Sequence, residues 1–411
     1  RQQLQDMIMG LIASGVEASL LDRPGGIFVR PAQQISQEDR ILVQAVARLI
    51  IDDNRGSLVE QVNRRRVRSS PMPFTPTAGR LAFADNFDSV VTEQSAAPLL
   101  LSNRYGGFSA DGTEYVIALE AGETTPAPWV NVLANAQFGT VVSESGSAYT
   151  WAENAHEFRL TPWLNDPVTD SCGEAIYLRD EETGHYWSPT PLPCRGKGLY
   201  VTRHGFGYSV FEHTEEGLRT ELWVYVSPDS AVKLSVLKVH NVSGRTRRLS
   251  ATGYVEWVLG ELRSKTAMHV VTESDPATGA LFARNAYSSD FPGRVAFFDV
   301  DNPARTVSCD RSEFLGRNNS LRAPAAMSQA RLSGRVGAGL DPCGAIQLGF
   351  DLDDGDEHEI IFRLGVASDA KAASTMVQRF RGRGTAANTL EAIRMHWRWT
   401  LGKVQVQTPD P

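Results

Sequence analysis

A large antiparallel β-sandwich with helical segments at both ends is the fold class that this sequence predicts. Short apolar or β-branched runs recur between Gly, Asp and Pro residues from residue 99 to residue 364, as in strands joined by turns. Few helical patterns separate these runs, which favours antiparallel strands over a parallel sheet with crossover helices. Apolar residues at helical spacing occur near the two ends of the chain.

The composition is that of an ordinary globular protein. Of the 411 residues, 42% are hydrophobic and 22% are charged, and this length is enough for a large core. The formal net charge of -7 argues against a nucleic-acid partner, because phosphate binding needs a basic excess. No apolar run reaches the roughly 20 residues of a membrane-spanning helix.

The cysteines and histidines match no metal or redox motif. Cys172, Cys194, Cys309 and Cys343 form no C-x-x-C pair, so we expect reduced thiols, with a disulfide between Cys172 and Cys194 left open. The eight histidines lack metal-ligand spacing. We therefore expect no metal and no resident cofactor.

Residues 1–68 form a predicted helical connector. Apolar spacing predicts helices over 3–20, from Ser36 through Ile50, and over 57–62, with Ser36 as the N-cap of the second. The basic run at 64–68 is expected to be a solvated face, although an acidic partner or anionic lipid is the alternative. Residues 69–98 are rich in Pro, Ser and Thr, which predicts an extended linker.

Residues 99–368 contain the predicted strands. Their alternation around 232–236 and 249–257 favours a half-buried antiparallel pair, and 180–184 is a hairpin turn signal. The further strands that we expect lie at 115–119, 139–143, 175–178, 208–213, 220–226, 280–283, 295–299, 345–350 and 357–364.

Residues 369–411 return to helical spacing. Apolar residues fit helices over 371–380 and 390–401, so we expect a helical linker towards a further domain. The chain begins with Arg1 rather than Met, and we expect it to be a piece of a longer protein.

The stretch 151–170 carries the most functional chemistry. It gathers two tryptophans, a histidine, an arginine, and several carboxylates and amides, while its prolines disfavour a long helix or a central strand. Aromatic faces beside polar groups suit a sugar ring. The alternative is a polar loop that caps a sheet edge.

Other motifs are weaker. The acid pairs Glu153 with Glu157, Asp166 with Asp170, and Glu256 with Glu261 are close in sequence, but this fixes neither the separation that a glycosidase requires nor the direction of the carboxylates. No G-x-S-x-G elbow occurs. Arg203 and His204 are candidates to bind an anion or a sugar hydroxyl, with a stabilised turn as the alternative.

Several long strings resemble glycoside hydrolase family 94, formerly glycosyltransferase family 36, and most of all the C-terminal phosphorylase-like region of cyclic β-1,2-glucan synthases. They lie in order at 103–108, 125–135, 138–145, 151–170, 203–208 and 253–257. The resemblance implies a galactose mutarotase-like super-β-sandwich that precedes an (α/α)₆ barrel. In the family, the catalytic aspartate lies in that barrel and inorganic phosphate is the nucleophile.

The resemblance therefore implies no catalytic residue in this chain, and we expect the chain alone to be inactive. It implies a β-glucan or glucooligosaccharide ligand, the barrel of the same parent chain as a partner, and a homodimer. Inorganic phosphate would serve the parent enzyme. The expected location is cytoplasmic, alone or within an inner-membrane-anchored parent. The substrate-binding residues that we predict are Trp151, Glu153, Asn154, His156, Glu157, Arg159, Trp163, Asn165, Asp166, Arg203 and His204.

Three functions remain open from the sequence. The first is a non-catalytic sandwich domain of a β-1,2-glucan-processing enzyme, which supports the barrel and lends loops to the sugar site. The second is an independent carbohydrate-binding module. The third is a complete small glycosidase that uses an acid pair such as Glu153 and Glu157.

Overall fold

The computed structural model describes residues 2–15, 18, 20–22, 26–47, 50–53, 56–64, 73–76, 98–404 and 406. The chain forms two compact units, Arg1–Val67 and Arg68–Pro411. Most of the predicted linker at 69–98, and most of the basic run at 64–68, lies outside the described residues. The predicted domain boundaries stay predictions.

The first unit is helical, with α1 (Gln2–Ala13), a 3-10 turn (Ala32–Gln34), α2 (Gln37–Val46) and α3 (Leu58–Arg64). Ser36 caps α2 as predicted, because its hydroxyl accepts a hydrogen bond of 3.0 Å from the amide of Asp39. Helix α1 ends at Ala13, before the predicted end at residue 20, since Ser14 and Gly15 disfavour its continuation.

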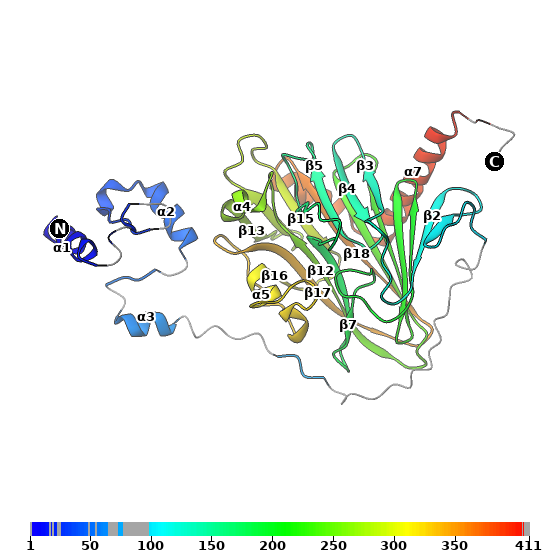
Figure 1. Ribbon diagram of the computed structural model, residues 1–411, viewed down its shortest axis with the longest axis horizontal. Helices are drawn as coiled ribbons and strands as arrows, with labels where there is room; N and C mark the ends of the chain where they lie inside the picture. The colour runs from blue at the N-terminus through cyan, green and yellow to red at the C-terminus, as the bar shows by residue number, and fades with distance from the viewer. Residues whose placement is uncertain are drawn as a thin grey trace. The chain divides into compact units, whose positions relative to one another are not determined.

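The second unit contains three antiparallel sheets within the described residues (Figure 1). In the ten-stranded sheet the order is β1 (Gly106–Phe108), β2 (Glu114–Leu119), β8 (Tyr200–Gly205), β9 (Tyr208–Glu215), β10 (Leu218–Val226), β11 (Val232–Asn241), β18 (Glu357–Ala367), β15 (Val295–Val300), β14 (Leu281–Asn285) and β13 (Val270–Ser274).

The five-stranded sheet has the order β16 (Thr306–Asp310), β17 (Pro342–Leu352), β12 (Arg247–Glu256), β6 (Glu174–Asp180) and β7 (Tyr186–Trp187). The third sheet is the meander β3 (Val130–Ala134), β4 (Phe138–Ser143) and β5 (Ala148–Ala152). Short helices stand between strands at α4 (Arg263–Thr266), Ala267–His269, α5 (Arg311–Leu315) and Ala325–Ser328. The antiparallel sandwich is thus confirmed.

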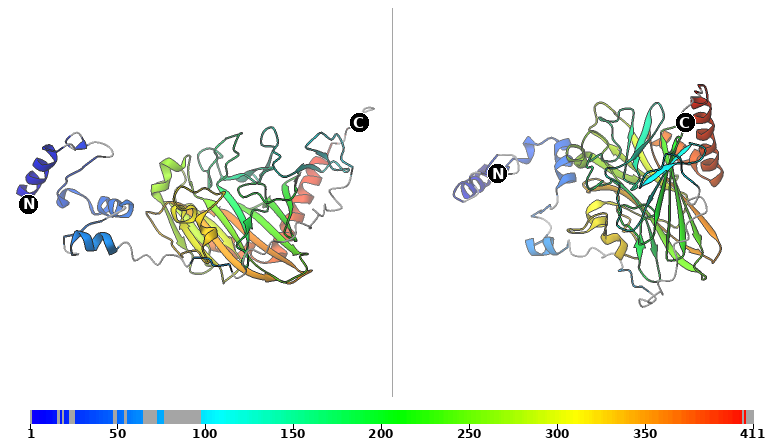
Figure 2. Two further views of the ribbon diagram at one scale, coloured as in Figure 1. Left: turned by 60° about the horizontal axis from the view of Figure 1, so that its bottom comes forward. Right: turned by 45° about the vertical axis from the view of Figure 1, so that its right-hand side comes forward.

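The ten-stranded sheet has a hydrophobic core on each face. One core contains Leu178, Leu249 and Ile346 of the five-stranded sheet. The other contains Ala373 and Ile393, which belong to α6 (Ala370–Phe380) and α7 (Arg383–Leu401), and Figure 2 shows these helices along the sheet.

Strands β11 and β12 are therefore buried more fully than their alternation indicated. In β11, Val232 and Lys233 are both buried, although they point to opposite faces of the strand. The sequence could not reveal this because the covering helices and the second sheet come from distant parts of the chain.

Strands β1, β3, β5, β8, β13 and β16 were not among the predicted ones. Trp151, expected at the start of a loop, lies in β5, and Arg203, expected near a turn, lies within β8. Polar residues interrupt the apolar pattern of these strands, and sheet pairing overrides that weak local signal. No helix among the described residues is long and apolar enough to cross a membrane.

Candidate functional site

The 151–170 segment starts on strand β5 and then turns back along it. Phe158 and Leu160 anchor the turn, since both are buried and Phe158 stacks on Phe291 with ring centroids 4.6 Å apart. Arg159 pairs with Gly260 through two backbone hydrogen bonds of 3.0 and 3.2 Å. The segment is therefore an ordered loop built onto the sandwich.

The first half of the segment is an exposed turn that is held by its own side chains. The carboxylate of Glu153 accepts two hydrogen bonds from Arg294, of 2.6 and 3.2 Å. The side chain of Asn154 accepts from the amides of His156 and Glu157, both at 2.9 Å. Nδ1 of His156 lies 2.8 Å from the carboxylate of Glu157.

Backbone strain gathers in the same segment. Glu153, Asn165 and Asp170 have φ values of 60°, 49° and 44°, in the left-handed region that Asn and Asp adopt readily and that is uncommon for Glu. Such strain persists only where the surroundings enforce it and is frequent at ligand sites. The conformation of Glu153 therefore favours a functional role for the segment.

The aromatic residues of the segment form a row. Tyr149 lies between Trp151 and Trp163, with ring centroids 5.2 and 4.8 Å from them. Trp151 lies over Gly139 of the neighbouring strand, where an added Cβ would come within 2.4 Å of the indole. Tyr149 is buried, whereas Trp163 is 37% exposed. The row therefore presents one fixed aromatic surface, at Trp163.

A cavity of about 260 Å³, here called the Trp163 cavity, lies beside this surface. Strands β3 and β4 contribute Val130 and Val141, and the second half of the segment contributes Trp163, Asn165, Asp166 and Asp170. The structure thus brings three predicted residues together, Trp163, Asn165 and Asp166. The other predicted residues of the segment, from Trp151 to Arg159, do not line this cavity.

The pKa values of two carboxyl groups at this cavity are shifted in opposite directions. Burial raises the pKa of Asp170, although the hydroxyl of Ser143 donates to it at 2.6 Å. Hydrogen bonds, first of all from the Thr169 hydroxyl, lower the pKa of Asp166. The cavity therefore combines an apolar wall with an ionised carboxylate and a partly buried acid, and perturbed acids in a cavity are typical of functional sites.

Tyr149 and Asp170 were missing from the predicted site residues. Tyr149 stands two residues before Trp151, so the period of a strand places both side chains on one face. That spacing was available in the sequence and became informative only once β5 was known to be a strand.

Arg203 and His204 lie on strand β8, away from the Trp163 cavity lining. Arg203 donates to Glu114 at 3.0 Å and to Glu212 at 2.9 Å. The ring nitrogens of His204 lie 2.9 Å from the Ser209 hydroxyl and 3.0 Å from the Trp129 carbonyl. These bonds give His204 a structural role, which is to hold the chain that enters β3.

Burial lowers the pKa of His204 to about 4, and this predicts a pH-dependent stability. Between about pH 6.5 and pH 4, His204 is protonated in the unfolded chain but stays neutral in the folded chain. The folded state therefore loses stability as the pH is lowered through this range. We expect this group to contribute a loss of about 3 kcal/mol. Urea unfolding of wild type and His204→Asn across this pH range measures it.

The variant should show a shallower decline than wild type, whereas the control His396→Asn, on the exposed side of α7, should keep the wild-type decline. Equal slopes for wild type and His204→Asn would contradict the assignment.

The remaining acid pair, Glu256 with Glu261, binds cationic side chains. Glu256 accepts from Arg311 at 2.6 Å and lies 2.9 Å from Nε of Arg263. Glu261 forms an ion pair with Lys265. These contacts favour structural ion pairs over a catalytic pair.

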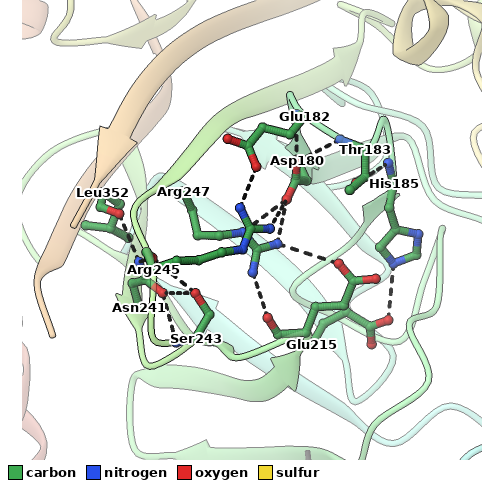
Figure 3. A network of polar contacts seen from close by, with 11 residues as sticks. Asp180, Glu182, Thr183, His185, Glu215, Asn241, Ser243, Arg245, Arg247 and Leu352 are labelled. Atoms are coloured by element: carbon green, nitrogen blue, oxygen red, sulfur yellow. Dashed lines mark hydrogen bonds and ion pairs between the residues drawn. The ribbon is translucent and has the colours of Figure 1, made fainter. Parts of the chain in front are cut away.

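Another polar cluster contains Asp180, His185, Glu215 and Arg247 (Figure 3). Asp180 accepts from the amide of Thr183 at 3.0 Å and from Nε of Arg247 at 3.1 Å. Glu215 lies 3.2 Å from Nε2 of His185, and this hydrogen bond raises the pKa of His185. The cluster joins turns of the ten-stranded sheet and the five-stranded sheet, and its charged groups form ion pairs with one another. We therefore infer that it stabilises the contact between these two sheets. No metal-binding cluster occurs among the residues that the structure describes.

Residues 113–383 match the family model of the glycosyl hydrolase 94 supersandwich domain. The chain belongs to this family. The match confirms the resemblance inferred from the six strings, and the three antiparallel sheets agree with it.

Two relatives and one structure indicate the range of similarity. This supersandwich chain is 40% identical to the cyclic β-(1,2)-glucan synthase NdvB of Rhizobium meliloti, over 75% of the chain and 11% of that protein. It is 26% identical to the N,N'-diacetylchitobiose phosphorylase of Vibrio proteolyticus, over 75% of the chain and 39% of that protein. A bacterial glucoamylase complexed with acarbose overlaps 71% of the chain and 41% of its own, with 6% identity and a TM-score of 0.41.

The chain therefore spans well under half the length of the two relatives. It is a domain of the kind found in proteins of the glycosyltransferase and phosphorylase type.

Proposed function

We propose that this chain is the non-catalytic supersandwich part of a β-glucan-processing enzyme. It supports a following (α/α)₆ barrel and lends the 151–170 segment to the sugar site of the parent protein. The observation that carries the proposal is the exposed ring of Trp163, which lines a cavity together with Asn165 and Asp166. The names of the glucan synthase and of the chitobiose phosphorylase support a carbohydrate ligand.

The chemistry of the Trp163 cavity suits a sugar. A pyranose has an apolar C–H face that packs on an indole ring, and hydroxyl groups at its edge that bind amides and carboxylates. Tyr149 holds Trp163 in place before a ligand arrives, with their ring centroids 4.8 Å apart. A fixed ring loses little conformational entropy on binding, which favours recognition even by a small surface.

Helix α7 supports the second part of the proposal, the contact with a barrel. Its inner face packs on the sheet through Ala386 and Ile393. Its outer face leaves Met395 60% exposed and Trp399 66% exposed, one turn apart. Large exposed apolar side chains that lie together often mark an interaction surface, so a further domain is the natural cover for Met395 and Trp399.

The test of the sugar site is ligand-observed NMR of the 411-residue chain with sophorose, the β-1,2-linked glucose disaccharide. We expect weak binding, with Kd on the order of 1 mM, because the barrel half of the site is not in the chain. Trp163→Ala should weaken this binding at least about tenfold, since it removes the stacking surface.

Trp399→Ala is the matched control, because it removes an exposed tryptophan outside the Trp163 cavity. It should leave the binding that depends on Trp163 unchanged. Loss of binding in the control but not in Trp163→Ala would contradict the proposed site.

The same measurements separate the rival functions. Tight binding, with Kd near about 1 µM, would favour an independent carbohydrate-binding module. Hydrolysis or phosphorolysis by the purified chain, abolished by Glu153→Ala or Glu157→Ala, would favour a complete glycosidase. The contacts of Glu153 with Arg294 and of Glu157 with His156 support the absence of turnover.

A further inference from the structure

A second and larger cavity, here called the α7 groove, lies between helix α7 and residues of β2, β8 and the start of β9, with the turn between β1 and β2. Its volume is about 820 Å³, within the usual range of small-molecule sites. Figure 1 shows α7 beside β2. The Trp163 cavity shares no lining residue with it. The function proposed above does not use this groove.

The groove exists because α7 packs closely on the sheet along only one side of the helix, where Ile393 and Trp397 lie over Gly207. Gly207, in the turn between β8 and β9, has a φ of 83° and lies directly under the helix. A Cβ at Gly207 would come within 2.4 Å of Nε1 of Trp397 and 2.5 Å of Cγ2 of Ile393. This close approach holds one side of α7, while the side that faces β2 and the turn between β1 and β2 stays open.

The polar side chains of the α7 groove are fixed in place. Arg203 is held by two hydrogen bonds of 3.0 Å to Glu114, and both side chains are only 13% exposed. The guanidinium carbon of Arg394 lies 5.4 Å from the ring centroid of Tyr208 and 5.1 Å from that of Trp223. No ion pair of Arg394 is found among the described residues.

The charges of the lining cancel. Three acids and three arginines line the groove, namely Asp111, Glu114, Glu391, Arg203, Arg394 and Arg398. A phosphate or another strongly charged ligand would gain little from such a balanced set, whereas a neutral ligand with many hydroxyl groups finds both donors and acceptors. Phe206, which also lines the groove, is 45% exposed and adds an apolar surface.

We propose that the α7 groove is a second carbohydrate-binding site, which takes a neutral oligosaccharide. The aromatic and guanidinium planes contact the faces of the sugar rings, and the ionised groups bind their hydroxyls. This site goes beyond the proposed function and is independent of the Trp163 cavity. It would hold a glucan chain on the sandwich at a distance from the bond that the parent enzyme processes.

The test combines hydroxyl-radical footprinting with titration of linear β-1,2-linked glucooligosaccharides into the 411-residue chain. Without sugar, Phe206 should be oxidised, and saturating sugar should protect it. Part of the oligosaccharide binding should remain in the Trp163→Ala variant. Phe206→Ala and Arg394→Gln should each weaken this remaining binding by about tenfold. Both side chains reach the solvent, so folding should survive; circular dichroism checks this.

The pattern across variants separates the two sites. If Phe206→Ala and Arg394→Gln lose the binding that remains in Trp163→Ala, a sugar site in the α7 groove is supported. This conclusion does not depend on whether the Trp163 cavity binds sugar. Binding of inorganic phosphate in place of neutral oligosaccharides would overturn the proposal. So would protection of Phe206 before any sugar is added, because the groove would then be covered by the chain itself.

Discussion

Asp299→Asn should destabilise the second unit by about 3–5 kcal/mol. Asp299 is fully buried on β15 and is surrounded by Arg305, Arg363 and Arg381, at 2.9, 3.7 and 2.8 Å. Arg363 is itself fully buried and donates to the carbonyl of Phe380 at 2.6 Å. Removal of the carboxylate charge would leave a buried guanidinium without its counter-charge. Urea unfolding measures the loss.

Asp229→Asn is the matched control for this change. Asp229 also pairs with an arginine, Arg379, but both side chains are more than half exposed. Exposed ion pairs contribute little, so the control should change stability by less than about 1 kcal/mol. Similar losses in the two variants would contradict the importance of burial at Asp299.

The cluster of Asp299 with Arg305, Arg363 and Arg381 also affects helix α7, which the proposed function requires for the contact with a barrel. Arg381 stands between α6 and α7, and Phe380 ends α6. The cluster therefore fixes the junction between α6 and α7 against β15 and β18. We expect the variant to loosen α7 before it unfolds the sandwich, and hydrogen exchange of α7 amides would report this order.

Glu174→Leu should cost a similar amount, about 3–5 kcal/mol. Its carboxylate lies 2.5 Å from Nζ of Lys233, whose side chain is only 4% exposed. The hydroxyls of Thr140 and Thr150 lie 3.2 and 3.4 Å from the same nitrogen but carry no charge. Without Glu174, the ammonium group would be buried without a partner, and thermal or urea unfolding would detect it.

The pH dependence of this variant gives a second measurement. An unpaired buried lysine has a lowered pKa, so the unfolded chain binds more protons than the folded chain. The Glu174→Leu variant should therefore regain stability as pH rises towards about 10, whereas wild type should not. The double variant Lys233→Met with Glu174→Leu should recover most of the loss, because it removes both charges.

Glu261→Leu is the control for this pair. Glu261 contacts Lys265 four residues along the chain, and the lysine side chain is 63% exposed. The expected loss is below about 1 kcal/mol, since water solvates the remaining ammonium group. A loss as large as that of Glu174→Leu would mean that the buried position of Lys233 is not the cause.

Much of the fold was predictable from the sequence because it depends on local pattern. The Ser36 cap, the helices near 371–401 and most of the long central strands follow from neighbouring residues. Short strands such as β3, β5 and β8 were missed, because their pattern is too weak to be read without the strands that pair with them.

The candidate site was predictable only in part. The sequence placed Trp163, Asn165 and Asp166 in one functional stretch, and the structure places them in one cavity. Tyr149, which holds Trp163, comes from a strand that the sequence did not predict.

Arg203 and His204 differ in a way that is visible only in the folded chain. The sequence alone was enough to predict the family, from strings that match in order, and the antiparallel sandwich, from the recurrence of short strands. It could not determine that these two neighbours differ in role, with Arg203 in the α7 groove and His204 bonded to Trp129. Alternation along a strand sends them to opposite faces, but the residues that cover each face come from distant parts of the chain.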